Sequence, residues 1–179
     1  MDIKGTKTEQ NLYKTFAGES RARNKYTFYC EKARRQGYQY IASVFADTSV
    51  NELAHARRVF SDFLNLNKST EENLLDAAMG EAFETEKLYK EFEQTARAEG
   101  FPEIADFYKE LREVEEAHKE RFMSVLKNLK EGKAFRRDTP VKWCCMNCGY
   151  EHDGREAPSP CPLCKYPQGF FKVCCEDYK

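Results

Sequence analysis

The sequence predicts a mainly α-helical protein, a bundle of four long helices followed by a small metal-binding β domain. Four long segments place apolar residues three and four positions apart, which is the spacing of one helix face. Acidic and histidine side chains recur on these apolar faces. The end of the chain has two C-x-x-C pairs among glycines and prolines, a composition that disfavours helices.

Length and composition narrow the class of protein. A chain of 179 residues holds one core of ordinary size and a small second domain. A net charge of −1 gives no basic surface of the kind that binds nucleic acid. The N-terminus has no apolar signal segment, and no apolar run approaches the roughly 20 residues that span a bilayer. We expect a cytoplasmic protein without nucleic-acid or membrane partners.

Capping residues and glycines delimit the first two helices. Thr6 and Glu9 have the spacing of a capping box, and the apolar pattern after them predicts a helix over residues 8–35. Gly37 ends this helix. A second helix is expected over residues 38–64.

Similar signals delimit the other two helices. Ser69 and Glu72 form a second capping-box pattern, which predicts a third helix that ends near residue 98, before Gly100. Pro102 suits the first turn of a fourth helix, which should end near Gly132.

The chain is expected to divide into a helical domain and a small C-terminal domain. Residues 1–132 hold the four helices, and residues 143–179 hold the cysteine pairs. Between them, residues 133–142 are basic and contain proline, which predicts a linker.

Seven side chains with metal-binding chemistry lie on the apolar helix faces. An E-x-x-H pair places a carboxylate and an imidazole on one face, where both can reach one ion. Two such pairs, with single glutamates from two other helices, form the dimetal site of some four-helix bundles. Without cations, these buried carboxylates would cost several kcal/mol each. The alternative, that they lie on solvated faces, explains their recurrence less well. The candidates are Glu19, Glu52, His55, Glu81, Glu84, Glu115 and His118.

Four of the eight cysteines form a second candidate metal site. Two C-x-x-C pairs can together present four thiolates to one tetrahedral ion, either iron or zinc. Iron is favoured by the aromatic residues nearby and by the neighbouring helical domain, although a structural zinc ribbon stays open. The expected ligands are Cys145, Cys148, Cys161 and Cys164, and the aromatic or proline neighbours are Trp143, Tyr150, Pro162, Phe170 and Phe171.

The remaining cysteines have no partner motif. Cys144 precedes a ligand and in an extended chain would point away from the site. Cys30, Cys174 and Cys175 are expected to be buried filler or free thiols.

These motifs resemble those of rubrerythrins, in which a ferritin-like di-iron domain precedes a rubredoxin-like domain. The resemblance covers essentially the whole chain, through AGESRARNKYTFY, NELAHARR, GEAFETEKLY, EEAHKERF, CMNCGY and CPLC. It implies that the seven helical candidates bind two irons, with Glu52 and Glu115 bridging them. It also implies that Glu84 is favoured as a ligand in the oxidised state and His55 in the reduced state.

The resemblance further implies a non-haem peroxidase that reduces hydrogen peroxide to water in oxidative-stress defence. One iron at the four-cysteine site would relay electrons from an external rubredoxin-type reductase, ultimately from a reduced nicotinamide cofactor. Tyr26 and Tyr89 would donate hydrogen bonds near the di-iron site, although ordinary core roles explain them equally well. The alternatives are a ferroxidase or iron-handling protein, and a metal-binding protein with a zinc ribbon.

The connection between the second and third helices limits the topology. Ferritin-like bundles join these helices by a crossover along the bundle, which for helices of about 40 Å needs at least about 12 extended residues. Too few residues are available between His55 and Glu81. Either the bundle is a simple up-down one, or two chains exchange helix pairs. We expect the swapped homodimer.

Overall fold

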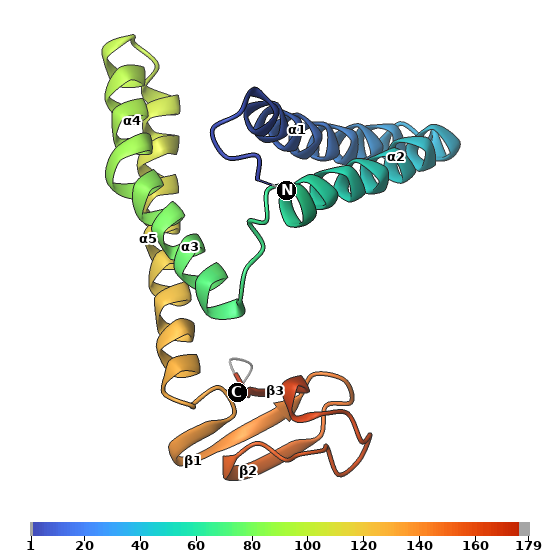
Figure 1. Cartoon of the computed structure of the whole chain (residues 1–179), viewed down its shortest axis with the longest axis vertical. Coiled ribbons are helices and arrows are strands. Elements are labelled where there is room, and N and C mark those ends of the chain that lie inside the picture. The colour runs from blue at the N-terminus through green and yellow to red at the C-terminus, as the bar shows by residue number, and fades with distance from the viewer. Residues whose placement is uncertain (1, 176–179) are drawn as a thin grey trace. The chain divides into compact units, whose positions relative to one another are not determined.

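The computed structural model describes residues 2–175 and shows long helices followed by a small antiparallel sheet (Figure 1). Internal contacts divide the chain into two compact units, Met1–Ser69 and Thr70–Lys179. Within residues 2–175, no helix is both long and apolar enough to cross a membrane.

The first unit is a hairpin of two long helices. Helix α1 (Lys7–Arg35) packs against α2 (Gln39–Arg57), as the blue and teal ribbons of Figure 1 show. The hydroxyl of Thr6 caps α1 by accepting the N–H of Glu9 at 3.1 Å. After α1, Gly37 has a φ of +84°, a left-handed conformation that costs glycine little. The predicted start and end of the first helix are confirmed.

Small side chains line the contact between α1 and α2. Cys30, Ala33 and Ala42 form a buried cluster. Farther along, the Ser49 hydroxyl donates to the carbonyl of Arg23 at 3.0 Å, which ties the helices together. Large apolar side chains remain exposed, and Val50 keeps 65% of its surface accessible. The hairpin therefore presents apolar surface that further helices would cover.

The helices of the second unit form another antiparallel pair. Helix α3 (Thr70–Phe83), the π-helix η2 (Glu84–Leu88) and α4 (Tyr89–Ala98) follow one another and pack against α5 (Pro102–Lys130) (Figure 1). The third and fourth predicted helices are thus present, with Pro102 in the first turn of α5 as expected.

Two π-helical segments occur where the sequence predicts regular α-helix, one inside the third predicted helix and one at the end of the second. One is η2, and the other is η1 (Arg58–Phe63), which follows α2. At η1 the N–H of Leu64 donates to the carbonyl of Val59, five residues back, at 2.9 Å. Such turns occur frequently at functional sites, and η2 begins at Glu84, one of the predicted ligands.

The C-terminal residues form a three-stranded sheet in the order β2-β1-β3. The central strand β1 (Arg136–Cys145) pairs antiparallel with β2 (Glu151–Glu156) and with β3 (Phe171–Val173). A short 3-10 turn, η3 (Gln168–Phe170), leads into β3.

Most of the stretch predicted as a linker belongs to β1, which begins at Arg136. The basic side chains there make local contacts. The guanidinium of Arg137 lies 5.3 Å from the centre of the Trp143 ring, and Lys133 pairs with Asp138 at 2.9 Å. The charged residues and the proline predicted a linker. These residues form a strand instead because β1 pairs with β2 and β3, which lie farther along the chain. The domain boundaries themselves stay a prediction.

The core of the sheet domain surrounds the cysteine pairs. The side chains of Trp143, Cys145 and Cys161 are almost fully buried, together with Ala157 and Phe171. The indole N–H of Trp143 donates to the carbonyl of Gly154 at 3.1 Å, so its polar atom is satisfied.

Candidate metal centres

The first helical hairpin brings together Glu19 from α1 with Glu52 and His55 from α2. We call these residues the first cluster. The Nδ1 atom of His55 lies 3.0 Å from Oε2 of Glu52 and 3.5 Å from Oε2 of Glu19. One ligand atom of each residue lies within 4.8 Å of the others, so the three can reach one ion.

The second unit forms the same arrangement. Glu81 from α3 lies beside Glu115 and His118 from α5, and these residues are the second cluster. The Nδ1 atom of His118 lies 2.7 Å from Oε2 of Glu115 and 3.9 Å from Oε1 of Glu81. The glutamates are largely covered, since the side chain of Glu115 is only 12% exposed. Six of the seven predicted helical ligands thus fall into two matching triplets.

Glu84 lies outside both triplets in the described residues. It opens the π-helix η2, and its carboxylate hydrogen-bonds the hydroxyl of Tyr89, one turn later. Burial and this bond raise the pKa of Tyr89 to about 12, so its hydroxyl remains protonated and donates to Glu84. The proposed ligand role of Glu84 stays a prediction.

Tyr26 has a different environment. Its ring lies 6.3 Å from the rings of Tyr29 and Phe45, centre to centre, within the α1–α2 hairpin. These ring contacts fit the alternative prediction for Tyr26, an ordinary packing role in the core. Its proposed role near the metal site stays a prediction.

The charges of the first cluster are strongly linked. A hydrogen bond with Glu52, followed by burial, raises the pKa of Glu19, while the same bond lowers the pKa of Glu52. The bond from His55 to Glu52 in turn raises the pKa of the imidazole. The protonation of the two carboxyl groups is therefore linked, and a bound cation would favour the ionised form of both.

In the second cluster, burial and then the charge of Glu115 raise the pKa of Glu81. In each cluster, carboxylate and imidazole groups converge to within ligand distance of one another. Divalent iron accepts both kinds of donor. Both clusters fit the binding of one metal ion each.

The four predicted cysteine ligands converge in the sheet domain. The Sγ atoms of Cys145 and Cys164 are 3.7 Å apart, those of Cys148 and Cys161 are 3.8 Å apart, and all four lie within 4.8 Å of one another. This is the spacing of a tetrahedral four-thiolate site, so the residues fit a single iron or zinc ion.

The two C-x-x-C turns have the same hydrogen bonds. In the first, the N–H of Cys145 donates to Tyr150 at 2.9 Å, and the N–H of Gly149 donates back to Cys145 at 2.8 Å. In the second, Cys161 donates to Tyr166 at 2.8 Å, and Lys165 donates back to Cys161 at 3.0 Å. The residue after each second cysteine has a positive φ, of 76° and 63° respectively.

The thiols of this site interact strongly without a metal. A hydrogen bond from Asn147, followed by one from the backbone of Tyr166, lowers the pKa of Cys164 to about 6. For Cys148, the backbone N–H of Tyr150 lowers the pKa, but burial and the neighbouring thiols outweigh it and raise the pKa to about 12. Four adjacent thiolates need a cation to neutralise them, as a metal site provides.

The structure corrects the prediction for Cys174. Cys144 and Cys174 form a disulfide, with their Cα atoms 5.2 Å apart. The sequence predicted Cys174 to be buried filler or a free thiol because it belongs to no motif. The two residues meet because β1 and β3 are paired, and single-sequence patterns do not reveal that register. Cys30 and Cys175 are free, as predicted.

Comparisons with known proteins show which family this chain resembles. Residues 10–126 and 72–143 match the family model described as Rubrerythrin, and residues 143–172 match that of the rubredoxin-like domain of rubrerythrin. The chain is 40% identical over 192 residues to Rubrerythrin-1 of Clostridium acetobutylicum, with 98% of each chain covered. It is 42% identical to the Rubrerythrin of Clostridium perfringens, again over 98% of each chain. The Rubrerythrin of Porphyromonas gingivalis is 42% identical over 95% of this chain and 91% of its own.

Proposed function

The chain belongs to the rubrerythrin family, and on this premise we propose that it is a peroxidase that reduces hydrogen peroxide to water. Members of the family are oxidoreductases, and the cofactors are a di-iron centre in the helical part and iron in the four-cysteine site. The observation that carries the proposal is the pairing, in one chain, of two matching carboxylate–histidine clusters with a four-thiolate site.

We propose that the first and second clusters, together with Glu84, hold the two irons. When bound, two ferrous ions supply the two electrons that split the O–O bond. Glu52 and Glu115 are the most buried carboxylates of their clusters and suit the bridging positions. Glu84 and the more exposed His55 are the ligands proposed to exchange as the charge of the site changes.

Reduction of one hydrogen peroxide to two waters also consumes two protons, which the protein must deliver. The protonated hydroxyl of Tyr89 donates to the Glu84 carboxylate, so these residues form a proton-holding pair at the edge of the second cluster. Tyr89 orients the carboxylate and keeps a proton beside it.

Electrons are proposed to enter at the four-cysteine site from an external rubredoxin-type reductase. Cys145 and Cys161 are buried, whereas Cys148 is exposed and Cys164 is partly so. The side of the site formed by Cys148 and Cys164 therefore gives a reductase its shortest approach to the iron. We place this reaction in the cytoplasm, as part of defence against oxidative stress.

We further propose that two chains exchange helix pairs to form the active dimer. Residues 64–69 join η1 to α3, and six extended residues reach at most about 22 Å. The 29 residues of α1 are about 43 Å long. A ferritin-like crossover along the bundle is therefore too long for this connection. In the exchanged dimer, the first cluster of one chain meets the second cluster of the other.

An anaerobic stopped-flow experiment tests the activity. Fully reduced protein is mixed with hydrogen peroxide or with oxygen while the visible absorption of the oxidised iron–thiolate centre is followed. We expect rapid reoxidation that is much faster with peroxide, is lost in Glu52→Ala, and is kept in the adjacent surface variant Asn51→Ala. Slow reoxidation by peroxide, or reoxidation at the same rate in Glu52→Ala as in the wild type, would contradict the proposal. Faster oxidation by oxygen would favour ferroxidase activity instead.

A further inference from the structure

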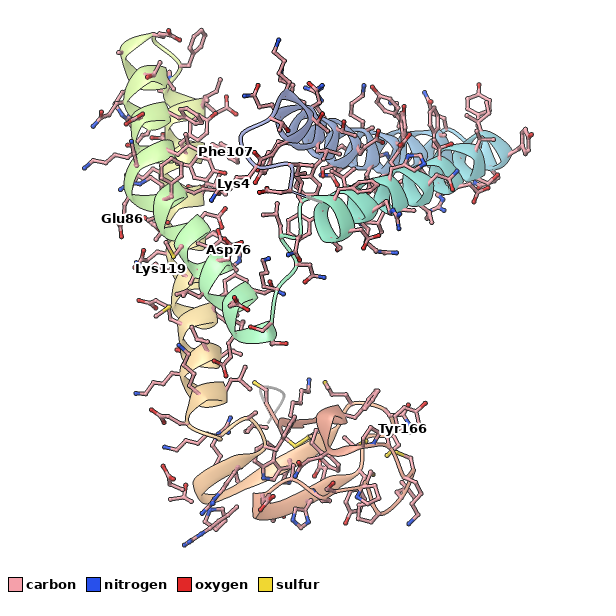
Figure 2. The ribbon with its side chains drawn as sticks, in the orientation of Figure 1. Lys4, Asp76, Glu86, Phe107, Lys119 and Tyr166 are labelled. Carbon is pink, nitrogen blue, oxygen red and sulfur yellow. A yellow bond between two sulfur atoms is a disulfide. The ribbon has the colours of Figure 1, made fainter. Side chains whose placement is uncertain are left out.

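The disulfide between Cys144 and Cys174 joins the ends of two paired strands, and Figure 2 shows it as a yellow bond in the sheet domain. The N–H of Cys174 donates to the carbonyl of Lys142 at 2.9 Å, which extends the β1–β3 ladder to this residue. A Cα separation of 5.2 Å lies within the usual range for disulfides. The strand pairing therefore holds the two cysteines at bonding separation.

We propose that Cys144 and Cys174 are a reversible redox switch, oxidised by hydrogen peroxide and opened by a dithiol, whose disulfide slows the loss of iron from the four-cysteine site. The choice of oxidant rests on the proposed function. The pair itself lies outside the residues that hold any of the proposed irons.

Neither cysteine of the pair is fully buried. Cys144 and Cys174 are half-buried, and the next residue, Cys175, is an exposed free thiol. Cys30, by contrast, is buried between α1 and α2. A disulfide at a half-exposed position is open to attack by an external thiolate, as regulatory disulfides are.

The position of the disulfide couples it to the metal site. It closes a loop with a sequence separation of 30 that contains every ligand of the site: Cys145, Cys148, Cys161 and Cys164. Cys144 directly precedes the first ligand on β1. Phe171 on β3 pairs with this first ligand, Cys145. The N–H of Met146 donates to the carbonyl of Phe170, just before β3, at 2.7 Å.

Release of the iron requires the first cysteine pair to separate from the second. The disulfide holds β3 on β1 and limits the conformations open to this loop. The closed switch should therefore keep the thiolates around the metal when peroxide is present. Loss of the metal would leave those thiolates free to be oxidised.

The chemistry balances with peroxide as oxidant. One thiolate attacks a peroxide oxygen, and cleavage of the O–O bond leaves a sulfenic acid and a hydroxide, which is protonated to water. The second thiol attacks the sulfenic sulfur, forming the S–S bond and releasing a second water. In reverse, an external dithiol attacks the disulfide, becomes oxidised itself, and leaves both cysteines as thiols.

Thiol mapping of the full-length, iron-loaded protein tests the switch. Protein reduced with dithiothreitol is treated with hydrogen peroxide, alkylated, and analysed by peptide mass spectrometry. We expect a Cys144–Cys174 disulfide that forms with peroxide and is lost again with dithiothreitol. Glu52→Ala should behave in the same way, which separates this result from any failure of peroxidase activity. A bridge that resists dithiothreitol in folded protein, or sulfinic acids in its place, would overturn the proposal.

Iron release tests the consequence. The iron–thiolate absorption is followed in the presence of a strong iron chelator. We expect loss about tenfold slower from the oxidised protein than from the reduced protein. Cys174→Ser, and independently Cys144→Ser, should lose iron at the reduced rate in both conditions, whereas Cys175→Ser should keep the difference.

Two further outcomes would count against the switch. Equal rates of iron loss in the two states would show that the disulfide does not protect the site. The sulfurs of Cys144 and Cys174 and a carboxylate oxygen of Glu151 also lie within 4.8 Å of one another. An extra zinc ion bound by the reduced wild type and lost in Cys174→Ser would assign the pair to metal binding instead.

Discussion

The Nδ1 atom of His118 lies 2.7 Å from Oε2 of Glu115, three residues earlier on α5. The corresponding atoms of Glu52 and His55 on α2 are 3.0 Å apart. In each case a single glutamate from the neighbouring helix completes the triplet. Each pair of helices therefore presents two glutamates and one histidine in the same arrangement.

Replacing Glu115 by alanine should lower the iron content of the helical part and spare the four-cysteine iron. Glu115 is the carboxylate nearest His118, so its loss removes a donor and frees the imidazole to rotate. We expect iron affinity at this cluster to fall by more than about tenfold. Metal analysis per chain measures this, with the iron–thiolate absorption as the internal standard.

The matched control is Glu116→Ala. Glu116 is the next residue on α5, and its carboxylate pairs with Lys119 at 2.6 Å, away from the second cluster. It should keep its full iron content. Full iron content in Glu115→Ala as well would remove Glu115 from the ligand set.

The raised pKa of Glu81 predicts an unusual pH dependence for the metal-free protein. Burial is the main cause, and it lifts the pKa above its ordinary value of 4.5. Between 4.5, the ordinary pKa of the unfolded state, and the higher pKa of the folded state, the folded state binds more protons than the unfolded state. The free energy of unfolding therefore falls as the pH rises through this window. Near neutral pH the ionised carboxylate therefore lowers stability, and below about pH 4 this cost is absent.

Glu81→Gln should consequently raise the melting temperature of the metal-free protein near pH 7, and the gain should disappear below about pH 4. Thermal unfolding followed by circular dichroism measures both. The control Glu86→Gln changes an exposed carboxylate whose partner is Lys119 (Figure 2). Destabilisation of metal-free Glu81→Gln at pH 7 would show that burial of this carboxyl is not a cost.

Tyr89→Phe should slow peroxide turnover about tenfold while leaving iron content unchanged, because a hydrogen bond to a charged group contributes about 1.5–3 kcal/mol. The variant removes the hydroxyl that donates to Glu84 and keeps the ring. Tyr108→Phe is the control, since its ring stacks on that of Tyr89 with centres 5.9 Å apart. Equal turnover in the two variants would assign Tyr89 to packing alone.

The helices could be predicted because their signals are local. Thr6 caps the first helix, Gly37 and Gly100 follow helix ends with positive φ, and Pro102 begins the last helix, as the sequence indicated. The comparisons also confirm the mainly α fold class with its rubredoxin-like end. The π-helix at Glu84 left no signal, because one extra residue in a turn barely changes the apolar period over a long helix.

The candidate sites were predictable to different degrees. The E-x-x-H and C-x-x-C spacings bring their side chains together within one turn, so their convergence follows from local geometry. The pairing of Cys144 with Cys174 depends on the register of two strands separated by both metal-binding turns. The same non-local pairing explains why a stretch predicted as a linker contains the first residues of β1.

Mixing two inactive variants tests whether helix pairs are exchanged. Glu52→Ala disables the first cluster, and Glu115→Ala disables the second. In an exchanged dimer that contains one chain of each variant, one site combines both defects, while the other combines two intact halves. In a dimer whose sites each form within one chain, every site keeps one defect.

The two variants are co-expressed with different affinity tags, and the heterodimer is purified through both tags. Exchange predicts that the heterodimer recovers about half of the wild-type peroxidase activity and half of its helical iron, because one of its two sites is intact. Each homodimer should stay inactive, since both of its sites combine a defective half with an intact one. A heterodimer as inactive as its parents would reject the exchange, and the connection at residues 64–69 would then favour a simple up-down bundle within each chain.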